Sequence, residues 1–95
     1  MDLTDAQIGD FKARAQWLNA TLKVGKEGLS PEFLAALDDA LKHHGLVKVR
    51  FDAHKKERKE LSLQLAEKTG SRLISWGGNV VVLFRPKPDG AAQPT

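Results

Sequence analysis

The segment Val24–Pro31, with the sequence VGKEGLSP, joins a GxxG loop directly to the start of a helix. Ser30 can cap this helix with its hydroxyl group, and Pro31 suits the first helical position, where a backbone N–H would have no helical partner. Gly25 and Gly28 give the loop backbone conformations that other residues rarely adopt. The segment therefore predicts a sharp loop followed by a helix N-terminus, an arrangement that favours anions.

Two interpretations of this loop are open. In the first, the glycines that flank Lys26 and Glu27 let the backbone of a ligand come close, as in KH modules, where a GxxG loop clamps the backbone of single-stranded RNA. In the second, the loop is a tight turn between a strand and a helix, since glycine is common in turns. The spacing of two glycines is compatible with both interpretations, so other parts of the sequence are needed to choose between them.

The chain has 95 residues, of which 41% are hydrophobic, and this length supports one domain with one modest core. We expect the domain over residues 1–86 and a flexible tail over 87–95, a segment rich in proline and glycine. The chain contains no cysteine, which excludes a disulfide framework and a thiolate zinc site. Its first residues carry no apolar run, so we expect neither a signal peptide nor a membrane span, and a soluble protein of the cytoplasm.

Basic residues are concentrated in one part of the chain. Fifteen Lys and Arg residues against twelve Asp and Glu residues give a net charge of +3. Between residues 48 and 59, only Asp52 and Glu57 oppose a set of basic side chains, namely Lys48, Arg50, Lys55, Lys56, Arg58 and Lys59. Such separation predicts a basic face suited to an anionic partner, whereas a solvated helix end with salt bridges is the alternative.

Apolar residues recur at helical spacing in two segments. The first begins after the capping-box pair Thr4 and Gln7 and covers about 5–18, and the second runs from Pro31 to Gly45, which is placed as a helix C-cap. The segment 52–69 is ambiguous, because its leucines alternate as in a strand while its Lys, Glu, Gln and Ala residues favour a helix. Its length and its glycine end lead us to predict a third helix there.

Strands are predicted where residues are β-branched or alternate in polarity, at 21–24, 47–51, 72–76 and 80–85. The last two flank Gly77-Gly78-Asn79, which is typical of a hairpin turn. The element order is therefore α-β-α-β-α-β-β. Helical crossovers require parallel pairing and a hairpin requires antiparallel pairing, so we predict an α+β protein with a mixed sheet packed against helices.

An enzyme would need a nucleophile, a base or a metal site, and the histidines His43, His44 and His54 form no such constellation with the carboxylates. His43 and His44 are adjacent on a helix, so their side chains diverge by about 100°, unlike the i, i+4 pair of a metal-binding helix. Asp38 and Asp39 are also adjacent and fit a solvated helix face. We therefore expect no catalysis, no metal and no other cofactor.

The two tryptophans, Trp17 and Trp76, also have two interpretations. Their rings could stack on unpaired bases, but a small core mostly uses tryptophan for buried apolar area, which is the interpretation that we favour. No strand carries a string of aromatic residues, so an RRM-type mechanism is not expected.

Four blocks of the sequence together resemble the CRM domain family, and in particular its stand-alone bacterial members of the YhbY type. The blocks are Val24–Leu29, His43–Arg50, Thr69–Gly70 and Val81–Pro86, and the resemblance extends over about 3–86. It implies a two-layer fold with a four-stranded mixed sheet, similar to the C-terminal domain of the third bacterial translation initiation factor. It also implies RNA binding, since single-domain bacterial members associate with precursors of the large ribosomal subunit.

Under this resemblance, the RNA-contacting loop falls on Gly25, Lys26, Glu27 and Gly28. Nearby basic residues would support it electrostatically, namely Lys23, Lys48, Arg50, Lys55, Lys56, Arg58 and Arg85. We therefore predict a monomeric, non-catalytic RNA-binding protein of large-subunit assembly that shows no base-specific readout. The alternative is an adaptor that binds a protein of the pre-ribosomal particle through the same basic surface.

Overall fold

The structure, a computed structural model, describes residues 3–85 apart from the side chain of Trp76. Its elements in chain order are α1 (Asp5–Ala15), β1 (Leu22–Val24), α2 (Pro31–His44), β2 (Leu46–Phe51), the 3-10 helix η1 (Lys55–Glu57), α3 (Arg58–Thr69), β3 (Arg72–Gly77) and β4 (Val80–Phe84). The predicted α+β class and the order α-β-α-β-α-β-β are confirmed. The predicted tail at 87–95 lies outside the described residues.

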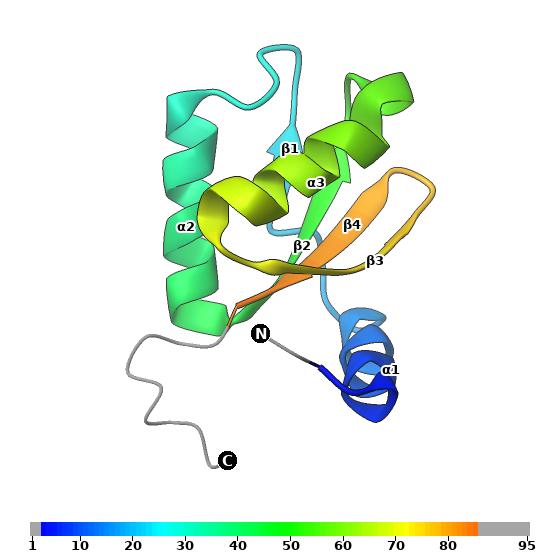
Figure 1. Ribbon diagram of the computed structural model, residues 1–95. Helices are drawn as coiled ribbons and strands as arrows, with labels where there is room; N and C mark the ends of the chain where they lie inside the picture. Colours follow the sequence, from blue (N-terminus) through cyan, green and yellow to red (C-terminus); the bar gives the residue numbers. More distant parts are fainter. Residues whose placement is uncertain (1–2, 86–95) are drawn as a thin grey trace.

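The strands form one four-stranded mixed sheet in the order β1-β2-β4-β3. β1 is parallel to β2, with Leu22 opposite Val49, whereas β4 is antiparallel to both β2 and β3. The parallel pair is possible because α2 carries the chain back from the end of β1 to the start of β2. In Figure 1, α2 and α3 lie over the sheet together, and α1 stands apart from them.

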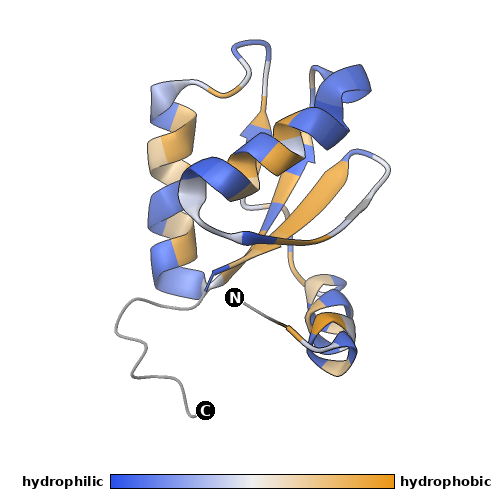
Figure 2. Cartoon of the chain, in the orientation of Figure 1, coloured by the Kyte–Doolittle hydropathy of each residue, from blue (hydrophilic) through white to orange (hydrophobic). Residues whose placement is uncertain are grey.

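Buried apolar side chains form a cluster on each face of the sheet. On one face, α2 and α3 pack against the inward residues of three strands, forming a cluster of Val24, Leu37, Leu41, Val47, Val49, Phe51, Leu65, Val81 and Leu83. On the other face, α1 packs Phe11 and Ala15 against Ile74 and Val82. Figure 2 shows the matching pattern: β4, in the interior of the sheet, is apolar along its length, and the helices carry both apolar and polar residues. The predicted two-layer arrangement is confirmed for the sheet with α2 and α3, and α1 covers part of the opposite face.

The first predicted helix ends at Ala15 rather than near residue 18. Beyond this point the ammonium group of Lys48, from β2, donates to the carbonyl oxygens of Ala15 and Leu18, each at 3.2 Å. Since the carbonyl oxygen of Ala15 also accepts from the amide of Leu18, the tertiary contact adds a second donor there and ties the turn after α1 to β2.

The third predicted helix begins at Arg58 rather than at residue 52. The backbone amides of residues 52 and 53 both donate to the carbonyl oxygen of Val24, at 2.9 and 3.1 Å, so they bond to β1 instead of entering a helix. His54 then adopts a left-handed conformation with φ 57°, which no α-helix can accommodate. Within residues 3–85, no helix combines the length and the apolar character that crossing a bilayer requires.

Candidate nucleic-acid interface

The GxxG loop lies at one end of the sheet, between β1 and α2 (Figure 1). Gly25, Lys26 and Glu27 are exposed, and the amide of Gly28 donates to the carbonyl oxygen of Gly25 at 3.0 Å, which closes the turn. Gly28 has φ +67°, a conformation that strains residues with a side chain, whereas a Cβ atom on Gly25 would meet nothing within 4 Å. Gly28 is therefore needed for the turn, and Gly25 leaves the backbone open to a ligand.

His54 braces this loop from the connection between β2 and α3. Its Nε2 atom lies 2.8 Å from the carbonyl oxygen of Lys26, and Nε2 is the donor because a carbonyl oxygen only accepts. A Cβ atom on Gly28 would lie 3.7 Å from the same Nε2, so the ring also packs beside the second glycine. The left-handed conformation of His54 costs about 1 kcal/mol, which the surrounding contacts have to offset. The imidazole thus positions the loop backbone.

The sequence carries no signal for this role, because His54 and Lys26 are 28 positions apart. From the sequence, His54 is a candidate only for catalysis or metal binding. The local signal is weak: Asp52 and His54 favour a helix less than the Lys, Glu, Gln and Leu residues that follow them. The loop and the β2–α3 connection meet because Val24 accepts hydrogen bonds from that connection.

The charges around Asp52 show that several cations gather at this end of the sheet. Arg50 Nε donates to Asp52 Oδ1 at 2.8 Å. This hydrogen bond lowers the pKa of the Asp52 carboxyl group below its ordinary value, and the charges of Arg50, Lys23 and Lys55 lower it further. One carboxylate therefore lies in the field of three basic residues from β1, β2 and η1.

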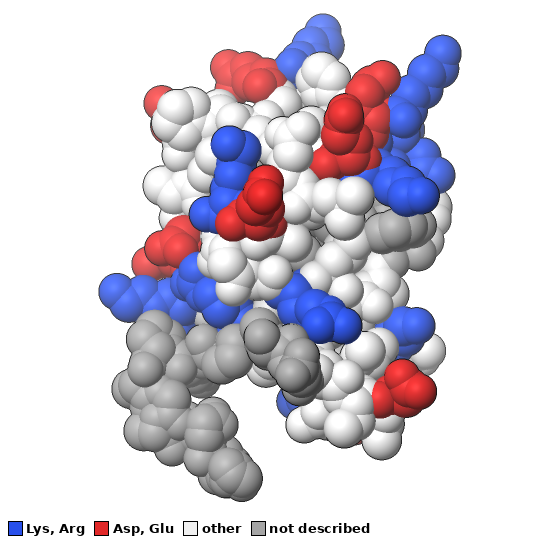
Figure 3. Space-filling view, in the orientation of Figure 1, with Lys and Arg blue, Asp and Glu red and all other residues white. Residues whose placement is uncertain are grey.

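Most of the predicted basic residues lie near the loop. Lys23, Arg50, Lys55 and Lys56 are exposed, while Arg58 is half-buried and donates from Nη1 to the carbonyl oxygen of Lys55 at 2.7 Å. Figure 3 shows Lys and Arg side chains at the top of the molecule, over the loop and the start of α3, with acidic side chains among them. We call this set the loop-end surface: Lys23, Gly25, Lys26, Glu27, Gly28, Arg50, His54, Lys55, Lys56 and Arg58.

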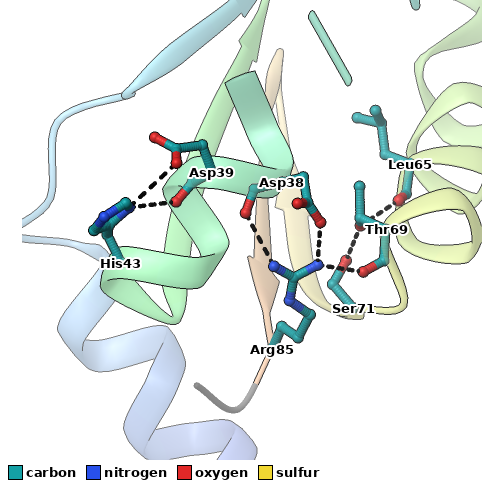
Figure 4. Close-up of polar contacts among 7 residues, drawn as sticks. All are labelled: Asp38, Asp39, His43, Leu65, Thr69, Ser71 and Arg85. Carbon is teal, nitrogen blue, oxygen red and sulfur yellow. Dashed lines mark hydrogen bonds and ion pairs between the residues drawn. The ribbon is translucent and has the colours of Figure 1, made fainter. Parts of the chain in front are cut away.

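Two predicted basic residues lie elsewhere. Arg85 follows β4 at the opposite end of the sheet, where only 18% of its side chain is exposed. Its guanidinium group donates to Asp38 Oδ1 at 2.6 Å, to the carbonyl oxygen of Asp38 at 2.9 Å and to that of Thr69 at 2.7 Å (Figure 4). Lys48 holds the end of α1, as described above. The structure does not bring these two side chains to the loop, and their contact with RNA stays a prediction.

The remaining candidates of the sequence lie outside the loop-end surface. His43 Nδ1 donates to the carbonyl oxygen of Asp39 at 2.9 Å within α2 (Figure 4). Among the described residues, no three His, Asp or Glu side chains converge on a possible metal position. The favoured interpretation of Trp17 as a core residue is wrong, since 86% of it is exposed. The side chain of Trp76 lies outside the described part of the chain.

Known proteins with the same arrangement identify the family. A mixed four-stranded sheet with this element order defines a small α+β domain, and the family model of the CRS1/YhbY (CRM) domain matches residues 3–85. The chain therefore belongs to the CRS1/YhbY (CRM) domain family, as its sequence blocks suggested.

Relatives along almost the whole chain agree with this assignment. An RNA-binding protein of Haemophilus influenzae is 31% identical over 92 residues, which cover 96% of this chain and 93% of the relative. A probable RNA-binding protein of Pseudomonas aeruginosa is 34% identical over 92 residues, which cover 94% and 88%. The solution structure of a Staphylococcus aureus protein, described as a proposed RNA-binding protein, matches with a TM-score of 0.76 and 28% identity over 88% of each chain.

Proposed function

We propose that this protein is a non-catalytic RNA-binding protein that acts in assembly of the large ribosomal subunit and clamps RNA backbone with its GxxG loop. The observation that carries the proposal is the loop itself: it is exposed, braced by His54 and surrounded by the cations of the loop-end surface. Membership of the CRM family and the RNA-binding names of two relatives support the ligand class.

The mode of binding follows from the loop geometry. A ribose-phosphate chain can approach Gly25 closely, because no side chain covers its backbone. α2 begins at Pro31, immediately after the loop, so the partial positive charge of its N-terminus adds to the attraction for phosphate. Lys26, Lys55 and Lys56 supply full charges nearby. Base edges are not read by this arrangement, so affinity depends mainly on phosphate contacts.

Salt dependence tests the phosphate contacts directly. If four to six phosphates are bound, the slope of log affinity against log salt concentration for single-stranded RNA should be about −3 to −4. Fluorescence anisotropy with a labelled oligonucleotide of mixed sequence measures it. A slope near zero would contradict backbone clamping.

Association with the assembling ribosome is a separate test. The tagged full-length protein should sediment with precursors of the large subunit, and limited nuclease treatment should release it. Persistence after nuclease treatment would favour an adaptor that binds a ribosomal protein. The double variant Lys26→Asp with Glu27→Asp should lose the association while keeping its circular dichroism spectrum.

We also propose that the protein works as a monomer in the cytoplasm. In light scattering, the full chain in RNA-free buffer should then have the mass of one copy, 10.4 kDa. A stable dimer mass at micromolar concentration would contradict this part.

A further inference from the structure

Trp17 is presented to solvent from a fixed backbone. Its own amide donates to the carbonyl oxygen of Arg14 at 3.1 Å, and the next amide, of Leu18, donates to Ala15 at 3.1 Å. The ammonium group of Lys48 donates to the carbonyl oxygens of Ala15 and Leu18, which precede and follow Trp17 in the chain. The ring is nevertheless 86% exposed. An uncovered indole on a hydrogen-bonded turn offers the open ring face on which an unpaired base can stack.

A groove of about 440 Å³ begins at Leu18, the residue that follows this tryptophan in the chain. It lies between the end of α1, the segment leading to β1, and the junction of α2 with β2, and it is lined by Arg14, Leu18, Asn19, Thr21, His44 and Leu46. The two leucines offer apolar surface, while the guanidinium, amide, hydroxyl and imidazole groups offer donors and acceptors. A nucleobase has the same division, with apolar faces and polar edges.

The charges of the groove suit an RNA strand. None of its lining residues is acidic, and Arg14 is the permanent cation among them. Arg14 Nε lies 3.3 Å from Asp10 Oδ2, and its guanidinium group lies over the ring of Phe11, 4.9 Å from the centroid. An exposed ion pair of this kind contributes little and does not prevent Arg14 from contacting a ligand.

The edge strand β1 connects this groove with the GxxG loop. Thr21 lines the groove, β1 follows, and Gly25 opens the loop. Four extended residues span about 13 Å, and Lys23 is exposed between the two ends. Because β1 is at the edge of the sheet, an RNA strand can run along it without crossing another strand.

We propose that this groove binds an unpaired nucleobase and that Trp17 stacks on a neighbouring base. Both bases belong to the RNA strand whose backbone the GxxG loop holds. This inference rests on the proposed RNA-binding function. The site adds affinity through bases, whereas the loop-end surface acts through phosphates. Stacking of one base is expected to change the dissociation constant about 5- to 100-fold.

The affinity test compares the full-length protein with Trp17→Ala. With a single-stranded RNA of about eight nucleotides, Trp17→Ala should weaken binding about 5- to 100-fold without changing the salt slope, and Trp17→Phe should retain part of the affinity. With an abasic ribose-phosphate oligomer of the same length, the wild type and Trp17→Ala should bind equally. Since Trp17 is exposed, its replacement should leave the circular dichroism spectrum unchanged.

Fluorescence provides a second readout. In Trp76→Phe, Trp17 is the remaining indole, and the same RNA should quench its emission whereas the abasic oligomer should not. Equal RNA affinity for wild type and Trp17→Ala, with the salt slope retained, would overturn the nucleobase site and leave the proposed function intact. A change in Trp17 emission caused only by a ribosomal protein would also overturn it. Absence of RNA binding by the wild type would instead refute the proposed function.

Discussion

His54 Nε2 donates a 2.8 Å hydrogen bond to the carbonyl oxygen of Lys26, which links the β2–α3 connection to the GxxG loop. The bond fixes a backbone carbonyl inside the loop, so it sets the direction of the neighbouring amide groups. Loop shape therefore depends on a residue that comes after β2 in the chain.

His54→Gly should weaken RNA binding while sparing the fold. Glycine accepts the left-handed conformation of residue 54 without strain but lacks the imidazole donor. The free energy of unfolding should stay within about 1 kcal/mol of the wild type, whereas RNA affinity should fall about 2- to 10-fold, the effect of one hydrogen bond. Urea denaturation and anisotropy measure the two quantities. Unchanged affinity would show that the brace is irrelevant to binding.

The two loop glycines should respond differently to alanine. Gly28→Ala forces a side chain onto φ +67° and should destabilise the protein by about 1 kcal/mol. Gly25→Ala meets nothing within 4 Å and should leave stability unchanged. Its methyl group should nevertheless obstruct a phosphate and weaken RNA binding about 10-fold or more, the loss of one hydrogen bond to a charged group. If Gly25→Ala binds RNA as well as the wild type, the loop is not a clamp.

Lys26→Gln should reduce the salt slope of RNA binding by about 0.7, the share of one phosphate on a single strand. Lys42→Gln is the matched control, because Lys42 is exposed in the last turn of α2 and changes net charge equally. Its slope should equal that of the wild type. Equal changes in both variants would mean that net charge, rather than the loop-end surface, governs binding.

Arg85→Ala should act on stability rather than on RNA. It removes a guanidinium group that joins α2 to the end of α3 through three hydrogen bonds. We expect the free energy of unfolding to fall by about 1–3 kcal/mol. RNA affinity should be retained at temperatures where the variant is folded. Lost affinity with normal stability would instead support the contact between Arg85 and RNA that the family resemblance implies.

Asp52 should contribute to stability only above acidic pH. Its hydrogen bond from Arg50 lowers its pKa from the ordinary value of 3.8, so the unfolded chain takes up this proton at a higher pH than the folded protein. The contribution is therefore present above pH 3.8 and is lost as the pH falls through the folded-state pKa. Stability curves of the wild type and Asp52→Asn should converge at low pH and separate above it. Parallel curves would contradict the ion pair.

Local sequence patterns determined the elements of this protein. Ser30, Pro31 and Gly45 mark the two ends of α2, and the observed cap contacts follow them. Alternation in β2 places Val47, Val49 and Phe51 on one face, as predicted. These signals succeed because capping and side-chain periodicity act within a few residues. The exposed GxxG loop could be located in the same way, together with most of its basic neighbours.

Only the tertiary structure decided how the site is supported. Lys48 binds the segment after α1 through carbonyl groups 33 and 30 positions away, and Arg85 joins Asp38 across 47 positions. The brace from His54 and the exposure of Trp17 likewise depend on how the elements pack. Such contacts involve partners that are distant in the chain, so local propensity cannot encode them, and they become determinate only when helices and strands meet around the core.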